Sequence, residues 1–214
     1  MDTVLEKYPI EKYSTKGLVV EQSIRNQMPD YLYYRGDINL LQSSVVAVIG
    51  SREISERGKA ISRNITQALC KREKTILNGL ALGCDAEVLR KVVEIGGKGI
   101  AVMPCGLDQI YPKTNQELAE EILEKGGCLI SEYPVGIKPR KENFVARDRL
   151  QALFPVWLSW WNLRREAVHG IQWNMPEDLR HRLLVIWKRK VLPARAMKCW
   201  CGAKRLMRLE KMKG

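Results

Sequence analysis

The stretch Val45-Val46-Ala47-Val48-Ile49-Gly50-Ser51-Arg52 decides the fold of this chain. Its first five residues form an apolar run rich in β-branched side chains, which is typical of a strand buried on both faces of a parallel sheet. Gly50 ends the run, and a short loop and a helix to about residue 72 are expected to follow. The stretch therefore predicts a strand, a loop and a helix, the repeating unit of α/β sheets.

The same unit recurs three times further along the chain. We expect strands at 75–77, 99–103 and 128–130, and helices at 86–95, at 116–124 and from about residue 140 onward. Right-handed crossovers place a helix between successive parallel strands. Four such units predict a Rossmann-like, doubly wound parallel α/β sheet with helices on both faces.

The chain divides into three predicted parts. Residues 1–44 are expected to form a short N-terminal extension that packs against the next domain, and residues 45–155 to form the Rossmann-like domain. The repeating pattern stops near Phe154, and the residues from Trp157 to Trp161 match no further unit. A sheet truncated there leaves an edge strand unpaired. Residues 156–214 are expected to be an atypical, poorly ordered tail.

The formal net charge of +12 is concentrated in this tail. Residues 156–214 hold 14 lysines and arginines against 4 acidic residues, whereas residues 1–155 hold 22 against 20. The tail also holds all six tryptophans and both histidines. The positive charge therefore does not by itself indicate a nucleic-acid-binding protein.

Composition excludes several other classes. No run approaches the roughly 18 apolar residues of a membrane span, and no secretory signal is present, so we expect a soluble, cytoplasmic protein without membrane contact. The cysteines lack paired CxxC spacing, so we expect no metal site, no cofactor and no disulfide. No histidine precedes His169, which disfavours Ser-His or metal-His catalysis, and no pair of nucleophile and base stands out. We expect a protein that is not an enzyme. Buried thiols are expected at Cys70, Cys84, Cys105 and Cys128, whereas Cys199 and Cys201 form a lone CxC.

Candidate ligand-binding residues follow the first two predicted strands, where loop amides and helix N-termini can hold an anion. Gly50 allows the backbone to approach a phosphate, while Ser51 and Arg52 can donate hydrogen bonds to it. A turn glycine beside a solvated arginine is the alternative. After the second strand, Gly79 and Gly83 allow another close approach, and Asp85 is expected to cap the next helix.

The loops after the third and fourth strands add cations. Lys113 comes two residues after Tyr111, and this pair suits a single nucleic acid strand because the cation contacts phosphate and the ring stacks on a base. Packing of Tyr111 beneath its own loop is the alternative. Arg147 and Arg149 point to different sides of a predicted helix, so we expect one on the ligand side and the other in an internal ion pair.

Together these segments resemble the DprA/Smf family of DNA-processing proteins. The family motifs VGSR, SGLAxGID, GLDxxYPxxN, SEYP and FxxRNR occur here in the same order. They read IGSR at 49–52, NGLALGCD at 78–85, GLDQIYPKTN at 106–115, SEYP at 131–134 and FVARDR at 144–149. The resemblance covers roughly residues 30–154. The chain departs from the family pattern at Asn78, where the family usually has serine, and at Asp148, where it usually has asparagine. It also lacks the later segment of the family that is rich in SGS and T.

The resemblance implies a protein that binds single-stranded DNA without base specificity and hands it to the RecA recombinase, in natural transformation where the host is competent. It also implies a homodimer, which loss of the later segment is expected to impair. The residues that it implies for DNA or phosphate binding are Arg52 and Lys113 as phosphate-contacting cations, Gly50, Ser51, Gly79 and Gly83 as shapers of the pocket, and Arg147 as part of its lining.

We hypothesise that residues 156–214 are an out-of-frame translation. Tryptophan and methionine are each encoded by a single codon. If every codon is read from the third base of the present codon, Trp160-Trp161-Asn162 must become Val-Glu. With free choice elsewhere, residues 156–162 can read LVVVVE and residues 166–176 can read SGSRHTMEYA, which match the family's missing strand and helix start. The alternative is a genuine basic arm.

Two other functions fit the predicted fold. A nucleotide-processing enzyme of the lysine-decarboxylase-like (cytokinin-activating) group shares this Rossmann variant, but it needs a PGGxGTxxE loop that neither frame contains. A nucleotide-binding sensor needs a defined contact to a base or ribose, which this sequence does not show. A DNA-binding recombination mediator is therefore the leading expectation.

Overall fold

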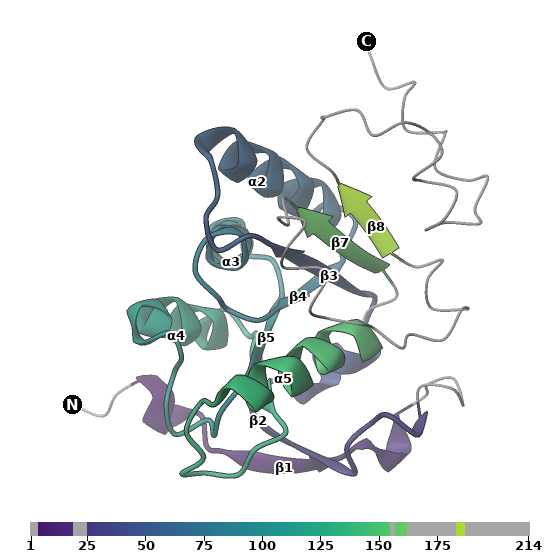
Figure 1. Cartoon of the computed structure of the whole chain (residues 1–214), viewed down its shortest axis with the longest axis vertical. Coiled ribbons are helices and arrows are strands. Elements are labelled where there is room, and N and C mark those ends of the chain that lie inside the picture. The colour runs from purple at the N-terminus through teal and green to yellow at the C-terminus, as the bar shows by residue number, and fades with distance from the viewer. Residues whose placement is uncertain (1–3, 19–24, 155–156, 162–182, 187–214) are drawn as a thin grey trace.

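The computed structural model describes residues 4–18, 25–154, 157–161 and 183–186, and these residues are built around one twisted sheet (Figure 1). The strand order is β1-β2-β6-β5-β4-β3-β7-β8. β1 and β2, and β2 and β6, pair antiparallel, whereas all other neighbours run parallel. The strands are β1 (Glu11–Ser14), β2 (Tyr31–Gly36), β3 (Val45–Gly50), β4 (Thr75–Asn78), β5 (Gly99–Met103), β6 (Cys128–Ser131), β7 (Trp157–Trp161) and β8 (Leu183–Ile186).

Helices cover both faces of this sheet, as expected of a doubly wound fold. Alternate residues of β3 reach opposite faces. Val46 and Val48 pack in one cluster with side chains of α2 and α3, whereas Val45 and Ala47 pack with Leu150 of α5. The helices are α2 (Glu56–Cys70), α3 (Cys84–Glu94), α4 (Gln116–Glu124) and α5 (Lys141–Leu153), with short 3-10 helices η1 (Val4–Lys7), η2 (Thr15–Gly17), η3 (Ile38–Gln42) and η4 (Lys113–Asn115). The Rossmann-like prediction is confirmed.

The strand order reverses beside β3. From β3 to β6 each strand is added on the same side of the previous one, and then α5 leads back to β7 on the other side of β3. The expectation that no strand follows Phe154 is wrong, because β7 pairs with β3 and β8 pairs with β7. The open backbone groups of β3 explain this pairing, since an edge strand accepts a neighbour of almost any sequence. The rest of the predicted tail, and with it Cys199, Cys201 and both histidines, lies outside the described residues.

The N-terminal residues lengthen the sheet at its other end. β2 lies beside β6, and β1 forms the outer edge. Leu32 is completely buried in the core, and the guanidinium of Arg35 donates from Nε to the carbonyl oxygen of Leu107 over 3.0 Å. The predicted extension therefore supplies strands as well as packing. No helix within the described residues has the length and apolarity needed to cross a bilayer.

Candidate functional site

A shallow hollow lies at the carboxyl ends of β3, β4 and β5, against the first turns of α5. Its volume of about 50 Å³ is far below the roughly 300–1,000 Å³ of sites that enclose a small molecule. A ligand would therefore lie across its mouth. The lining residues are Arg52 from the loop after β3, Gly79, Ala81 and Leu82 after β4, Pro104, Tyr111 and Pro112 after β5, and Phe144 and Arg147 from α5.

Phe144 is the centre of this hollow. The guanidinium carbons of Arg52 and Arg147 each lie 5.8 Å from the centre of its ring. The Tyr111 ring meets it edge-on, with centroids 5.4 Å apart and planes at 68°. Tyr111 remains 41% exposed, and Arg52 is exposed as well. The mouth thus presents an exposed cation beside aromatic rings, which suits a ligand that carries both phosphates and flat bases.

Arg147 differs from Arg52 because it is only 5% exposed. Its Nη1 donates to the carbonyl oxygen of Gly79 over 2.7 Å, and its Nε lies 3.0 Å from Oδ1 of Asp148. A β-carbon on Gly79 would lie 1.3 Å from that Nη1, so only glycine leaves room for the guanidinium. Arg147 therefore ties α5 to the loop after β4 and forms the floor of the hollow.

Asp85 lies beneath the same loop with 2% of its surface exposed. Burial raises its pKa to about 6, although Arg147 and the backbone amides of Gly79, Ala81 and Gly50 oppose the rise. Its Oδ2 accepts a hydrogen bond from the Gly79 amide over 3.1 Å. The expectation that Asp85 caps α3 is wrong, because Gly83 holds the N-cap position and the carboxylate instead braces the loop before the helix.

The loop after β3 is held against the start of α3. The Cys84 amide donates to the carbonyl oxygen of Ser51 over 3.0 Å, and Ser51 Oγ accepts from the Glu53 amide over 3.1 Å. Gly83 has a positive φ of +77°, and a β-carbon there would lie 2.2 Å from the carbonyl oxygen of Arg52. Glycine at 83 thus permits the backbone contact that positions Arg52.

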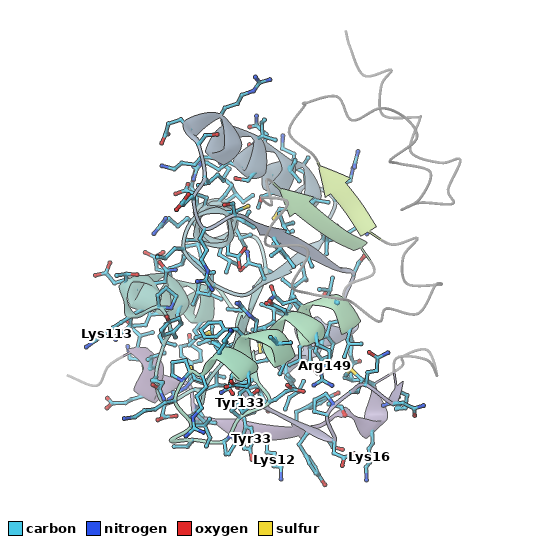
Figure 2. All side chains as sticks on the ribbon, viewed as in Figure 1. Lys12, Lys16, Tyr33, Lys113, Tyr133 and Arg149 are labelled. Carbon is cyan, nitrogen blue, oxygen red and sulfur yellow. The ribbon has the colours of Figure 1, made fainter. Side chains whose placement is uncertain are left out.

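Most of the predicted site residues come together here. The end of β3 and the loop after it bring Gly50, Ser51 and Arg52 beside the loop that carries Gly79 and Gly83, and Arg147 closes the floor. Lys113 is exposed in η4 and is not among the lining residues. Figure 2 shows it beside α4, pointing outward.

The arginine pair of α5 makes internal contacts at both positions. Arg149 donates hydrogen bonds to Glu132 and to the carbonyl oxygen of Gln27, as expected for the arginine that forms the internal ion pair.

Phe144 had no predicted role, although its spacing from Arg147 in the sequence could have indicated one. Residues three apart share a helix face, so a ring at 144 must lie beside an arginine at 147.

The described residues contain no candidate metal site, and their cysteines are free thiols. There, no group of histidine, cysteine or acidic side chains could hold a metal ion. Cys84, Cys105 and Cys128 are buried free thiols, as predicted, and Cys70 is half-buried. Burial raises the pKa of the Cys105 thiol to about 11, so it stays protonated at neutral pH.

Comparison with known proteins gives one consistent result. The family described as DNA recombination-mediator protein A matches residues 7–154. Protein Smf of Synechocystis sp. is 41% identical over 128 residues, which are 58% of this chain and 32% of the relative. The structure of DNA processing protein A (DprA) from Streptococcus pneumoniae has a TM-score of 0.62 at 33% identity, covering 73% of this chain and 54% of that one.

A second solved structure extends the likeness of fold. DNA processing protein A from Helicobacter pylori, described for its single-stranded DNA binding mode, has a TM-score of 0.70 at 24% identity and covers 90% of this chain and 86% of that one. The chain spans between 27% and 43% of the length of the curated relatives it matches. The matched residues contain all five motifs that carry the resemblance. The chain therefore belongs to the DNA recombination-mediator protein A family, the DprA/Smf proteins.

Proposed function

We propose that the hollow at the carboxyl ends of β3–β5 binds single-stranded DNA without base specificity, as part of a recombination mediator. The observation that carries this proposal is the exposed guanidinium of Arg52 beside the Phe144 ring, which also contacts the exposed Tyr111 ring. A cation holds a phosphate, and a ring stacks on any base, because every base has a flat face. The described single-stranded DNA binding of the Helicobacter pylori relative supports the same ligand.

Each predicted residue takes a separate part in this proposal. Gly50 shapes the end of β3 with its amide toward Asp85, Ser51 brings its backbone amide toward a phosphate held by Arg52, and Gly83 fixes the loop that carries them. Gly79 and Arg147 support the floor without reaching the ligand. The last of the predicted set, Lys113, contacts a phosphate beyond the mouth of the hollow, from its exposed place in η4.

A binding role fits the site better than catalysis. Asp85 has a raised pKa, which often marks a catalytic acid or base. Its carboxylate is nevertheless buried among loop amides and Arg147, and it does not line the hollow. A group that cannot reach a substrate cannot transfer a proton to it. We therefore propose that the chain is not an enzyme.

Transfer of the bound strand to RecA, in natural transformation or DNA uptake, is proposed on family membership. We further propose that residues 156–214 impair the family's homodimer, because the segment rich in SGS and T does not occur in them.

Sequencing the gene around the codon for Phe154 tests directly whether residues 156–214 are an out-of-frame translation. An intact frame through that codon with no downstream family motif in any other frame would contradict it.

Arg52→Ala is expected to weaken binding to oligo-dT and to lower the slope of log K against log salt by about one unit, because one phosphate contact is lost. Lys113→Ala is expected to do the same. Fluorescence anisotropy titrations at several salt concentrations measure both effects. Arg72→Ala, which removes an exposed arginine from the opposite end of the sheet, is the matched control and should change neither quantity. Unchanged affinity in both site variants would contradict the proposed function.

Asp148→Asn is expected to strengthen binding to oligo-dT a few-fold. Burial raises the pKa of Asp148, while Arg147 and Arg52 oppose the rise, so its negative charge acts on the cation that holds the phosphate. Asparagine keeps an oxygen for the contacts with Arg147 Nε and with Gln151 Nε2, which donates to Oδ1 over 2.9 Å. The same titration at low salt measures the gain. Weaker binding in a variant with unchanged thermal stability would show that the charge of Asp148 does not oppose the ligand.

A further inference from the structure

Large apolar side chains that face solvent gather at one end of the sheet. Leu82 follows β4, Tyr111 follows β5, and Val135 and Ile137 follow β6, so all four lie on loops at the carboxyl ends of parallel strands. Val145 lies in the second turn of α5, which begins at the same end. The remaining large exposed apolar residue among the described ones is Tyr31, at 43% exposed.

Tyr31 belongs to the same end because of the register of β2. β2 runs antiparallel to β6, with Tyr33 opposite Ser131, the last residue of β6. Two residues before Tyr33, Tyr31 therefore lies beyond the carboxyl end of β6. The ammonium of Lys12, on the neighbouring strand β1, lies 3.9 Å from the centre of the Tyr31 ring. Figure 2 shows Lys12 at the outer edge of the sheet.

The Lys12–Tyr31 pair repeats the chemistry of the hollow. In both places an exposed cation lies beside a partly exposed ring, and no described carboxylate forms a salt bridge with Lys12. A cation beside a ring offers a phosphate contact and a stacking face together. As a purely structural feature, an exposed cross-strand pair of this kind contributes little stability.

The loop after β6 connects the two places. This loop and the first residue of α5 contain Lys138, Arg140 and Lys141, all exposed, and the one acidic residue of the loop, Glu132, is paired with Arg149. The loop is held against the one that carries Tyr111, because the Gly136 amide donates to Asp108 Oδ1 over 3.0 Å and Gln109 Nε2 donates to the Ile137 carbonyl oxygen over 3.1 Å. A positively charged rim thus runs from the hollow toward β2.

We propose that the strand bound in the hollow continues across the loop after β6 and stacks a second time on Tyr31, with Lys12 on its phosphate. This inference rests on the proposed function and adds the path of the DNA. From β4 to β2 there are three strand spacings of about 4.8 Å, or roughly 14 Å. About four stacked nucleotides at roughly 3.4 Å each cover that distance. An oligonucleotide of two residues (dT2), about 7 Å long when stacked, occupies the hollow without reaching Tyr31, whereas a 20-mer reaches both places.

The test compares these two lengths of oligo-dT in anisotropy titrations. Lys12→Ala and Tyr31→Leu are each expected to leave binding of dT2 unchanged and to weaken binding of dT20 by about fivefold to tenfold. Tyr31→Phe keeps the ring and is expected to bind both lengths as the unchanged protein does. Both side chains are exposed, so the variants should keep the thermal unfolding temperature.

Arg52→Ala separates this inference from the function on which it rests. Loss of affinity for both lengths in Arg52→Ala, together with unchanged dT20 binding in Lys12→Ala and Tyr31→Leu, overturns the second contact and leaves the hollow in place. Equal weakening of both lengths in the Lys12 and Tyr31 variants also overturns it. If Arg52→Ala binds both lengths normally, the proposed function itself fails. Photo-cross-linking of an iodouridine 20-mer supplies a readout without mutation, and the path requires the Tyr31 peptide among the products.

Discussion

Arg147→Met is expected to lower the free energy of unfolding at pH 7 by about 3–5 kcal/mol, the usual effect of removing one partner from a buried charge pair. Methionine fills much of the same space but cannot donate to the Gly79 carbonyl oxygen or face the Asp85 carboxylate. The buried carboxylate is then left with loop amides alone. Urea unfolding followed by circular dichroism measures the loss.

The pH dependence identifies the cause of that loss. The pKa of Asp85 is already raised by burial from 3.8 to about 6, so the folded protein binds more protons than the unfolded chain between about pH 4 and 6. Stability therefore falls as the pH rises through this window. Loss of Arg147 raises the pKa of Asp85 further, so the deficit of Arg147→Met should be small at pH 4.5 and large at pH 7.5.

Asp85→Asn supplies the control, since asparagine carries no charge to be left unpaired. In the double variant, Arg147→Met should cost less at pH 7.5 than it does in the unchanged protein, and the pH dependence that remains belongs to Asp148, which also contacts Arg147. An equal loss at both pH values in the single variant would mean that packing, and not the buried charge, accounts for the role of Arg147.

Gly83→Ala is expected to reduce both stability and affinity for oligo-dT. The positive φ of +77° disfavours alanine by about 1–2 kcal/mol. The added β-carbon would also lie 2.2 Å from the carbonyl oxygen of Arg52 and 2.5 Å from that of Ser51, so the loop after β3 must move. Because that loop carries Arg52, affinity should fall at least as far as in Arg52→Ala. Thermal unfolding and anisotropy titration measure the two effects.

Gly96→Ala separates backbone conformation from contact. Gly96 has a similar φ of +67°, but a β-carbon there would meet nothing within 4 Å. This variant should lose stability and keep its affinity. Equal loss of affinity in Gly83→Ala and Gly96→Ala would show that the contact between Gly83 and the loop after β3 does not position Arg52.

The central strands and the position of the site are predictable because they depend on local sequence. Every residue of β4, β5 and β6 is buried, and each strand has an apolar centre that is followed by a loop. Carboxyl ends of parallel strands meet at one edge, and this rule alone brings Arg52 near Gly79. The tripeptide from Gly50 to Arg52, which directly follows an apolar run, therefore predicts the candidate site at this edge of the sheet together with the loops that follow the next strands.

The features that could not be predicted depend on residues far apart in sequence. The partner of β2 is β6, and nothing within the residues of β2 indicates a strand so distant in the chain. Asp85 has the sequence position of a capping residue, and only the tertiary fold shows that its carboxylate faces Arg147. The strand β7 was missed because pairing with an open edge makes little demand on sequence.

The pairing of β2 with β6 also affects the way the chain is made. Tyr33 can pair with Ser131 only after about 100 more residues have been translated. At roughly 5–20 residues per second, the nascent β1–β2 pair leaves the ribosome with the edge of β2 uncovered for about 5–20 seconds. Unpaired edges of this kind associate with other chains during synthesis. A ribosome-bound chaperone that shields β1 and β2 until translation reaches β6 would therefore prevent such association.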